Sequence, residues 1–543
     1  MIVRAIFRVL DDVKRTIGAG AIASATRRIG AALSLETDSP VEIAHELAFW
    51  TGLGGLEVRD SVVTALRGVG REDVRSLLEG MSPERAAVGI LLPEEGSGTP
   101  ASAGGRTPRP AAARGRSSAS AQECPATWRP APEVPIDAGV SFGRASAPRV
   151  ETLALGRAGR AIVDARPDLD TFVLKAALAD GRHAVGAPAT AALLRGFAEA
   201  LAGDRELLSR LAGVGARVDV LAPGDARFDE RDTLQILLQG PAASLGGALR
   251  TLGPALRRAS AAPPVAVRPP PHDPAGFARR ILQEHVRTAQ PDPGPLTTHI
   301  ALVSPFAGAA VRAALRSLVV RGTEPPAGLG RRPDGKGRRS AGADDRRPRT
   351  LPEPATRTAD LRPGRQVLSL PNLVQGRLLI AIPGSGDPAP LRALAWILHH
   401  AYSGRLGVKA IAETGLAYSM NSEVATRGGM LAYFTVGAAP DSLPALESAL
   451  ADVLARAAAS LSEEEIASFR SYARGSLPVR LSDPVQAAGV WLSALLHGEG
   501  HNGPRAAAER DGTVTLEEVA ALARRSLDPA RRLTVIVGRA SSP

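Results

Sequence analysis

The chain alternates short apolar runs with longer segments in which apolar residues recur every three or four positions. A short apolar run is typical of a buried strand, and the longer period is typical of a helix with one buried face. Strands are predicted at residues 161–163, 172–178, 216–221, 234–238, 367–370, 378–382 and 429–436. Helices are predicted at residues 189–201, 243–257, 277–287, 391–401 and 443–459, and Ser462 and Glu465 form a capping box that opens another. The pattern predicts a mixed architecture, either α/β or α+β, and the second half of the chain repeats the alternation of the first.

Two segments interrupt this pattern. Residues 96–147 and 323–365 consist mainly of Ala, Pro, Gly, Ser and Arg, with few large apolar side chains and no period. Such segments bury too little apolar surface to offset the loss of chain entropy on folding, so both are predicted to be disordered linkers. They separate an N-terminal piece at residues 1–95 from a first subdomain at 148–322 and a second at 366–543.

An internal repeat links the first and last of these pieces. Residues 71–93 and residues 516–538 each begin with an acidic helix, continue through a Pro turn and end in an apolar strand. Helix–turn–strand units are common, so chance similarity is one explanation. The alternative is that both segments close the same kind of domain, and that residues 1–95 are the tail of a preceding half.

The composition is that of a globular protein and excludes several classes. Of 543 residues, 44% are hydrophobic and 22% are charged, which excludes a wholly disordered or fibrous chain. The single cysteine, Cys124, cannot form an internal disulfide, so a disulfide-stapled fold is excluded. No apolar run is long enough to span a bilayer, and Arg4 and Arg8 interrupt the apolar start of the chain. The chain as written is expected in the cytoplasm, or in the periplasm if its true N-terminus lies upstream.

The net charge is +11, and 62 of the 66 basic residues are arginines. The stretches 96–132 and 331–349 carry +4 and +5, which leaves about +2 for the rest of the chain. Neither stretch interleaves aromatic side chains that would stack on bases, so no nucleic-acid partner is predicted. The preference for arginine over lysine runs through the whole chain, and it indicates GC-rich codon usage rather than a phosphate-binding surface.

The second subdomain carries the most specific motifs. In chain order they are Ser403-Gly404-Arg405-Leu406, Gly415-Leu416-Ala417-Tyr418-Ser419, a strand, an Ala- and Leu-rich helix, and a closing helix with Leu527-Asp528-Pro529 and a strand. In order and spacing they resemble the C-terminal subdomain of the insulinase/pitrilysin family of zinc metallopeptidases. The resemblance covers residues 366–543 well and residues 148–322 and 35–95 more weakly. It implies related α/β subdomains, two halves that close like a clamshell around a peptide, and a zinc-binding H-x-x-E-H motif in the active half.

This chain lacks that motif. Laid on the family pattern, the ligand and base positions fall on Ala192, Arg195 and Gly196, none of which offers a metal-binding atom. The histidines give no substitute, because residues 281–285 lack the first histidine of the motif, and the histidines at 399–400 end a helix, where a cation suits the helix dipole. We therefore predict no catalytic residue, no metal site and no bound cofactor on this chain, although zinc is the cofactor of the family.

The resemblance also implies an Arg and a Tyr that contact the peptide backbone or its terminal carboxylate. The Tyr corresponds to Tyr418, beside Gly415 and Leu416, whereas Ile411 occupies the Arg position. Lys409 lies nearby, but one ammonium group does not replace the two-pronged guanidinium. The predicted substrate-binding residues are thus Tyr418, Gly415, Leu416 and Lys409. The alternative for Tyr418 is an aromatic side chain packed on a strand, with its hydroxyl at the rim.

Two functions agree with these observations. In the first, the chain is the non-catalytic, substrate-enclosing half of a peptide-cleaving clamshell. Zinc and the general base then come from a zinc-bearing half of the same family, either a partner chain or a missing upstream part of the same polypeptide. In the alternative, the chain is a structural scaffold subunit without a role in proteolysis.

Overall fold

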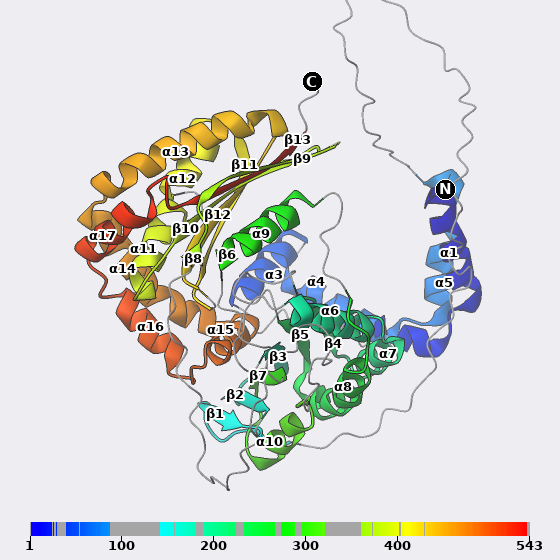
Figure 1. The fold of residues 1–543 in the computed structure, drawn as a ribbon. Helices are drawn as coiled ribbons and strands as arrows, with labels where there is room; N and C mark the ends of the chain where they lie inside the picture. Colours follow the sequence, from blue (N-terminus) through cyan, green and yellow to red (C-terminus); the bar gives the residue numbers. More distant parts are fainter. Residues whose placement is uncertain are drawn as a thin grey trace, which may run out of the picture. The chain divides into compact units, whose positions relative to one another are not determined.

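The computed structural model confirms the α+β fold (Figure 1). It describes residues 2–86, 142–180, 188–223, 233–265, 273–287, 296–320 and 360–539, apart from 24, 27–28, 30–39, 54, 157, 372, 401–402 and 428. The chain divides into two compact units, one made of residues 1–26 and 57–133 and the other of residues 27–56 and 134–543. The second unit holds both predicted α/β subdomains.

The N-terminal unit is helical. Its elements are α1 (Ile2–Thr16), α4 (Leu56–Gly68), α5 (Arg71–Glu79) and the short 3-10 helix η1 (Pro83–Arg85). At the start of α5 the carboxylate of Asp73 accepts a hydrogen bond from the backbone N–H of Gly70 at 2.8 Å. α5 and η1 are the helix and the Pro turn of the first repeat copy, and the strand predicted after them lies outside the described residues. α3 (Pro40–Leu53) belongs to the second unit.

The first subdomain contains a six-stranded sheet. Its strands are β1 (Arg149–Ala154), β2 (Gly159–Ala165), β3 (Thr171–Asp180), β4 (Arg217–Leu221), β5 (Leu234–Pro241) and β7 (Leu296–Ser304). Their spatial order is β1-β2-β7-β3-β5-β4, and neighbours are antiparallel except for the parallel pair β2 and β7. The central strand β7 is buried along almost its whole length, which requires cover on both faces of the sheet.

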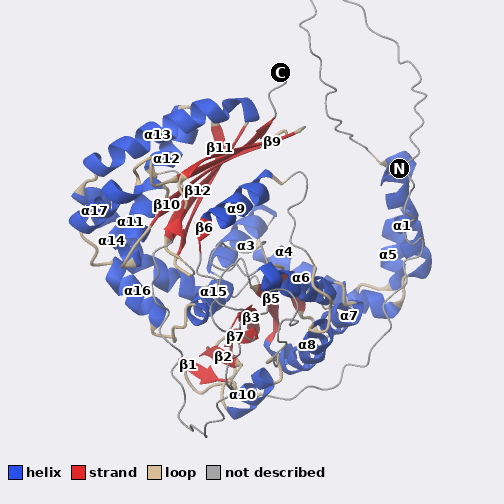
Figure 2. Cartoon of the chain, viewed as in Figure 1, coloured by secondary structure: helices blue, strands red, loops and turns tan. Residues whose placement is uncertain are grey.

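Helices cover one face of this sheet (Figure 2). They are α6 (Pro188–Ala202), α7 (Arg205–Gly213), the 3-10 helix η3 (Ala242–Ser244), α8 (Leu245–Ala259) and α10 (Ala309–Arg316). Leucines dominate the core between these helices and the strands, with Leu174 and Leu238 on the sheet and Leu194 and Leu252 on the helices. Their burial contributes about 25 cal/mol per Å² of apolar surface removed from water and holds the layers together.

The second subdomain repeats this topology with five strands. They are β9 (Gly364–Leu370), β10 (Gly376–Pro383), β11 (Ala417–Ala425), β12 (Leu431–Ala438) and β13 (Leu533–Arg539). Their spatial order, β9-β13-β10-β12-β11, corresponds to β2-β7-β3-β5-β4 of the first sheet, and the parallel pair β9 and β13 stands where β2 and β7 stand. The order along the chain corresponds as well, so the two subdomains are copies of one topology.

Helices and short helical turns cover the second sheet. They are α11 (Pro388–Leu398), α12 (Arg405–Gly407), the π-helical turn η4 (Val408–Glu413), η5 (Pro440–Ser442), α13 (Leu443–Ser460), α14 (Glu463–Ser482), α16 (Gly503–Asp511) and α17 (Leu516–Ser526). Side chains of Asp387, Ser462 and Thr515 cap α11, α14 and α17, and the predicted capping box of Ser462 and Glu465 is confirmed. A separate two-stranded ladder consists of β6 (Val286–Arg287) and β8 (Asp360–Leu361).

The two subdomains exchange one helix each. α9 (Pro274–His285) precedes β7 in the chain, yet it packs on β10 and β13 of the second sheet, where Ala278 and Leu282 are buried. α15 (Pro484–Leu496) precedes β13 in the chain, yet it packs on β3 and β7 of the first sheet. Most residues of α15 are buried, which is typical of a helix held between layers. Each sheet therefore depends on the other subdomain for the cover of its second face.

Polar contacts fix α15 on the first sheet. The indole N–H of Trp491 donates to the carboxylate of Asp164 on β2 at 3.0 Å, and the guanidinium of Arg166 binds the same carboxylate at 2.6 Å. Trp491 and Asp164 are both buried, and a buried carboxylate is tolerated only when it is paired and hydrogen-bonded. Beyond α15, the backbone N–H of His501 donates to Oγ1 of Thr152 on β1 at 3.1 Å. The position of α15 on the first sheet is thus fixed by polar contacts as well as by the burial of apolar side chains.

The predicted linkers overlap the fold at their C-terminal ends. Within 96–147, Arg144 forms an isolated β-bridge with Phe306, and within 323–365 the ladder strand β8 and the first residues of β9 are present. A bridge or a two-residue strand has no hydrophobic period, so the composition of these segments did not indicate them. The rest of both predicted linkers lies outside the described residues. None of the helices in the described ranges is both long and apolar enough to cross a membrane.

Candidate functional site

The first candidate site is the face of α6 on which the family pattern places the zinc ligands. Ala192 and Gly196 stand one turn apart and share this face. The extended segment 263–265 crosses it, because the backbone N–H of Val265 donates to the carbonyl oxygen of Ala192 at 2.8 Å. Arg195, at the position of the general base, has its guanidinium bound to the carboxylate of Glu199 at 3.2 Å. The face is covered by protein backbone and carries no free acid or base.

Gly196 shows how close this cover is. A Cβ atom added at Gly196 would lie 1.9 Å from the carbonyl oxygen of Pro263 and 2.9 Å from its carbonyl carbon. Real Cβ contacts of that kind do not occur, so no side chain fits here unless the backbone of residues 263–265 moves. A histidine ligand at this position is excluded by the packing as well as by the sequence. The residues present do not fit a zinc ion.

No substitute metal site is found in the described parts of the chain. They contain no group of three or more His, Cys, Asp or Glu side chains that could hold a metal ion. On α9, Nδ1 of His285 forms a hydrogen bond with the carbonyl oxygen of Ile281 at 2.9 Å, and Glu284 binds Arg280 at 3.1 Å. The incomplete motif at 281–285 is therefore engaged in contacts along its own helix.

The second candidate site is the edge strand β11, which stands at one end of the five-stranded sheet. Its pairing with β12 shifts register between Ala417 and Ser419, so Tyr418 is the extra residue of a β-bulge. The Tyr418 side chain is 51% exposed, and its hydroxyl has no hydrogen-bond partner among the described residues. A Cβ added at Gly437 of β12 would lie 2.8 Å from the Tyr418 hydroxyl oxygen, so the phenol lies across Gly437. The strand thus offers an aromatic side chain and an open backbone edge.

The turn before β11 is held by its own contacts. Thr414 ends the π-helical turn, and its hydroxyl donates to the carbonyl oxygens of Lys409 and Ala410 at 3.0 and 3.1 Å. Gly415 has a φ of +63°, a left-handed conformation that favours glycine, and Leu416 packs against the core. The ammonium of Lys409 binds the carboxylate of Glu413 at 2.9 Å. The four predicted residues thus lie on this turn and at the start of β11, and the charge of Lys409 already has a partner.

The position of the missing substrate-binding arginine and the nearest arginine before it, Arg405, are both engaged in contacts within the fold. Ile411 packs against the second core. Arg405 binds the carboxylate of Glu465 through two nitrogens at 2.7 Å, and donates to the backbone carbonyl of Ser460 at 2.7 Å. Burial is the largest single influence and raises the pKa of Glu465, but the hydrogen bonds from Arg405 and Ser462 and the charge of Arg405 together outweigh it, so the pKa of this carboxyl is lowered. Arg405 thus ties α12 to the junction of α13 and α14.

The two histidines after α11 have structural partners too. α11 ends at Leu398, and Nδ1 of His399 forms a hydrogen bond with Oγ of Ser422 on β11 at 2.9 Å. Burial lowers the pKa of His399, so this side chain is not the helix-capping cation that the sequence predicts. The His400 ring stacks on Trp396 with 4.6 Å between ring centroids. His399 therefore anchors the edge strand as a neutral group.

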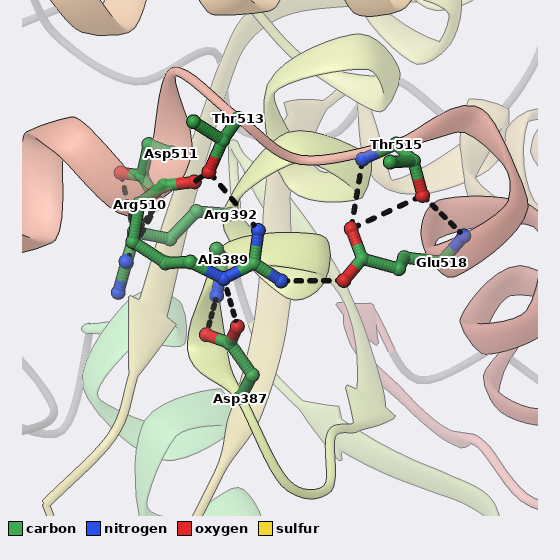
Figure 3. Close-up of polar contacts among 8 residues, drawn as sticks. All are labelled: Asp387, Ala389, Arg392, Arg510, Asp511, Thr513, Thr515 and Glu518. Atoms are coloured by element: carbon green, nitrogen blue, oxygen red, sulfur yellow. Dashed lines mark hydrogen bonds and ion pairs between the residues drawn. The ribbon is translucent and has the colours of Figure 1, made fainter.

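A cluster of charged side chains joins α11 to α16 and α17 (Figure 3). At its centre, Arg392 on α11 holds the carboxylate of Asp511 with contacts of 2.6 to 3.0 Å. Burial raises the pKa of Asp511, and the bond from Arg392 offsets this only in part. Arg510 extends the cluster, because it binds Glu518 at 2.6 Å and also Asp387.

The acids of this cluster also cap helices (Figure 3). Asp387 accepts from the backbone N–H of Ala389 at 2.9 Å, and Glu518 accepts from the backbone N–H of Thr515 at 2.8 Å. Hydrogen bonds from the Thr515 backbone and from Arg510 lower the pKa of Glu518. Because each carboxylate is held by an arginine and by a helix start or by burial, the cluster is a clamp between helices and not a source of reactive groups.

Sequence reasoning missed the cover of α6. The consecutive prolines Pro263 and Pro264 do predict an extended segment, since a residue before proline is restricted to extended conformations. Nothing in the sequence indicates that this segment lies on α6, because the contact is made by backbone atoms. The bulge at Tyr418 had no sequence signal either.

The comparisons agree with the motifs of the second subdomain. Residues 334–471 match a family model described as the peptidase M16 inactive domain. This match confirms the resemblance to insulinase/pitrilysin peptidases. A comparison with curated protein sequences gives no match.

Three bacterial proteins are among the solved structures that match this chain. The peptidase M16 inactive domain from Pseudomonas fluorescens is 16% identical, with 72% of this chain and 99% of that chain covered and a TM-score of 0.49. A protease from Helicobacter pylori is 11% identical, with 72% and 100% covered and a TM-score of 0.49. An M16-like peptidase from Alicyclobacillus acidocaldarius is 16% identical, with 72% and 98% covered and a TM-score of 0.44.

Proposed function

Because residues 334–471 match a family model described as the peptidase M16 inactive domain, we propose that this chain is the non-catalytic, substrate-enclosing half of an insulinase-like peptidase. It encloses the bound peptide on one side and offers the edge strand β11 for backbone hydrogen bonds with it. A zinc-bearing half of the same family supplies the metal and the general base.

The backbone over α6 is the observation that carries this proposal. The carbonyl oxygen of Pro263 occupies the space that any side chain at 196 would need, and Val265 is hydrogen-bonded to Ala192. A simple loss of ligands would leave an open pocket that a few substitutions could refill. Here backbone atoms fill the pocket itself, which supports a non-catalytic role for this face of α6.

The edge strand β11 supports the substrate-enclosing part of the proposal. An extended peptide can add to an exposed sheet edge through backbone hydrogen bonds, with side-chain contacts giving selectivity. Tyr418 stands at the bulge of this edge, half-exposed and with its phenol held over Gly437. The phenol can pack on a peptide side chain while its hydroxyl donates to a peptide carbonyl.

The test uses the purified full chain and a fluorescent, unstructured peptide of about 20 residues. We expect peptide binding without cleavage, no effect of chelators, and far less than one zinc per chain by elemental analysis. Tyr418→Ala is expected to weaken peptide binding about tenfold, a loss of about 1.4 kcal/mol. Addition of a zinc-bearing family half is expected to give chelator-sensitive cleavage.

Tyr472→Ala is the matched control, because Tyr472 on α14 is exposed to a similar degree, 44% against 51% for Tyr418. Equal losses in the two variants, or no peptide binding by the wild-type chain, would contradict the role of β11 and favour the scaffold alternative. One zinc per chain would overturn the non-catalytic assignment.

A further inference from the structure

The two sheets differ at one edge. In the first sheet, β2 is paired on both sides, with β7 parallel to it and β1 antiparallel to it. In the second sheet, the equivalent strand β9 is paired with β13 on one side only. None of the described strands pairs with the outer side of β9, and the two residues of β8 just before it pair with β6 instead. Among the described residues, the place beside β9 that corresponds to β1 in the first sheet is therefore unfilled.

The backbone N–H and C=O groups of every second residue of β9 point away from β13, toward the unpaired side of the strand. The N–H of Gly364 donates to the carbonyl oxygen of Arg532 at 3.0 Å, so the backbone groups of Gly364 point at β13. Because these groups alternate along a strand, those of Arg365, Val367 and Ser369 point outward. The Val367 side chain is 55% exposed. The edge offers a regular series of donors and acceptors with an apolar residue at its centre.

Nothing in β9 protects this edge in the usual way. Exposed edges are normally protected by proline, by lysine or by inward charges. β9 has no proline, and its one charged residue, Arg365, is bound to Glu447 on α13 through two nitrogens at 2.8 and 3.0 Å. An edge of this kind is suited to pair with another strand.

We propose that β9 pairs with β9 of a second copy of this chain, about a two-fold axis at Val367. The axis makes the two strands antiparallel, which is the direction of β1 beside β2 in the first sheet. Val367 then exchanges N–H···O bonds with Val367 of the other copy, since its backbone groups point outward. Arg365 faces Ser369 across the axis, so no like charges meet. The two five-stranded sheets become one continuous sheet.

A self-pair agrees better with these residues than an unrelated peptide does. Val367 opposite Val367 is a β-branched pair, of the kind that stabilises neighbouring strands, and the pairing is isologous as in most dimers. Gln366 and Leu368 also oppose each other, and no charge is left unpaired in the ladder. The edge β11, at the other end of the sheet, stays free. The dimer is therefore independent of the function proposed above.

The test is the mass of the full chain by light scattering and its crosslinking. We expect a concentration-dependent dimer, and at least a tenfold weaker dimer for Val367→Lys. In a Cys124→Ser background, Val367→Cys is expected to form a disulfide between copies, because paired residues of this type have Cα atoms about 5.5 Å apart, within disulfide range. Val479→Lys and Val479→Cys, at a valine of α14 that is 64% exposed, are the matched controls.

A wild-type chain that stays monomeric at about 0.1 mM would overturn the proposal, since strand pairing weaker than this has no use as an interface. A dimer that persists unchanged in Val367→Lys overturns it as well. So does a Val367→Cys variant that crosslinks no faster than Val479→Cys.

Discussion

The two subdomains share one strand order but differ in what covers it. The first sheet is closed at its β2 edge by β1, and its helix α6 is crossed by the backbone of residues 263–265. Within the described residues the second sheet ends in the edge strands β9 and β11, and its helix α11 is clamped through Arg392. Both sheets end in two edge strands, so the two subdomains differ in what lies beside β2 and β9 and in the segment that crosses α6. The strand order is therefore the same in both subdomains, and short added segments, such as β1 and residues 263–265, determine which edges and helix faces a ligand or partner can reach.

The exchange of α9 and α15 means that the two subdomains, although they differ, depend on each other for stability. Each sheet is covered on its second face by a helix whose chain neighbours belong to the other subdomain. Neither subdomain has a complete core without the other, so they are expected to unfold together. This expectation separates an exchanged pair from two domains that merely touch.

The largest effect is expected from breaking the exchange. Trp491→Ala removes a buried aromatic side chain of α15 and should lower the free energy of unfolding by about 3–5 kcal/mol. Trp491→Phe keeps most of the packing but removes the indole donor to Asp164, so a loss of about 1–3 kcal/mol is expected. Urea denaturation followed by circular dichroism measures both. Two separate transitions in the wild-type chain would show that the subdomains unfold independently, contrary to our expectation.

A smaller effect tests the sealed face of the first subdomain. Gly196→Ala should destabilise the chain by about 1–3 kcal/mol, because the added methyl group collides with the backbone at Pro263. The control is Gly475→Ala on α14, where nothing lies within 4 Å of an added Cβ. Alanine is the better helix former, so this control should gain about 0.5–1 kcal/mol. If both variants are stabilised, the segment 263–265 does not lie on α6.

The smallest effect concerns His399, which anchors β11 in the second subdomain. Burial lowers its pKa from the ordinary value of 6.5, so the folded state favours the neutral imidazole. Its contribution to stability is therefore present above pH 6.5 and is lost as the pH falls through the lower folded value. Between pH 7 and 5 the wild-type melting temperature should fall more than that of His399→Gln, by a few °C. His285→Gln is the control for loss of a histidine. If it changes the pH dependence of the melting temperature as much as His399→Gln does, the burial of His399 is not the cause.

The sequence predicted central elements better than edges. β3 and β10 are apolar runs buried between two layers, so their composition indicated them directly. The edge strand β11 is largely polar, and only its motif around Tyr418 marked it. The apolar composition of α15 predicts a buried helix, but it contains no information on which sheet the helix covers. The cover of α6 and the bulge at Tyr418 depend on backbone contacts between distant residues, which side-chain patterns do not encode.

The exchanged helix α9 has a consequence for synthesis of the chain. Its partners β10 and β13 lie later in the sequence, and β13 ends at Arg539. At 5–20 residues per second, roughly 10–50 s pass between the appearance of α9 and that of β13. During this interval Phe277, Ile281 and Leu282 lack the complete sheet that covers them in the folded chain. The nascent chain therefore carries a partly uncovered apolar helix for nearly half of its translation, and a chaperone that binds such helices is expected to hold it until the last strand is made.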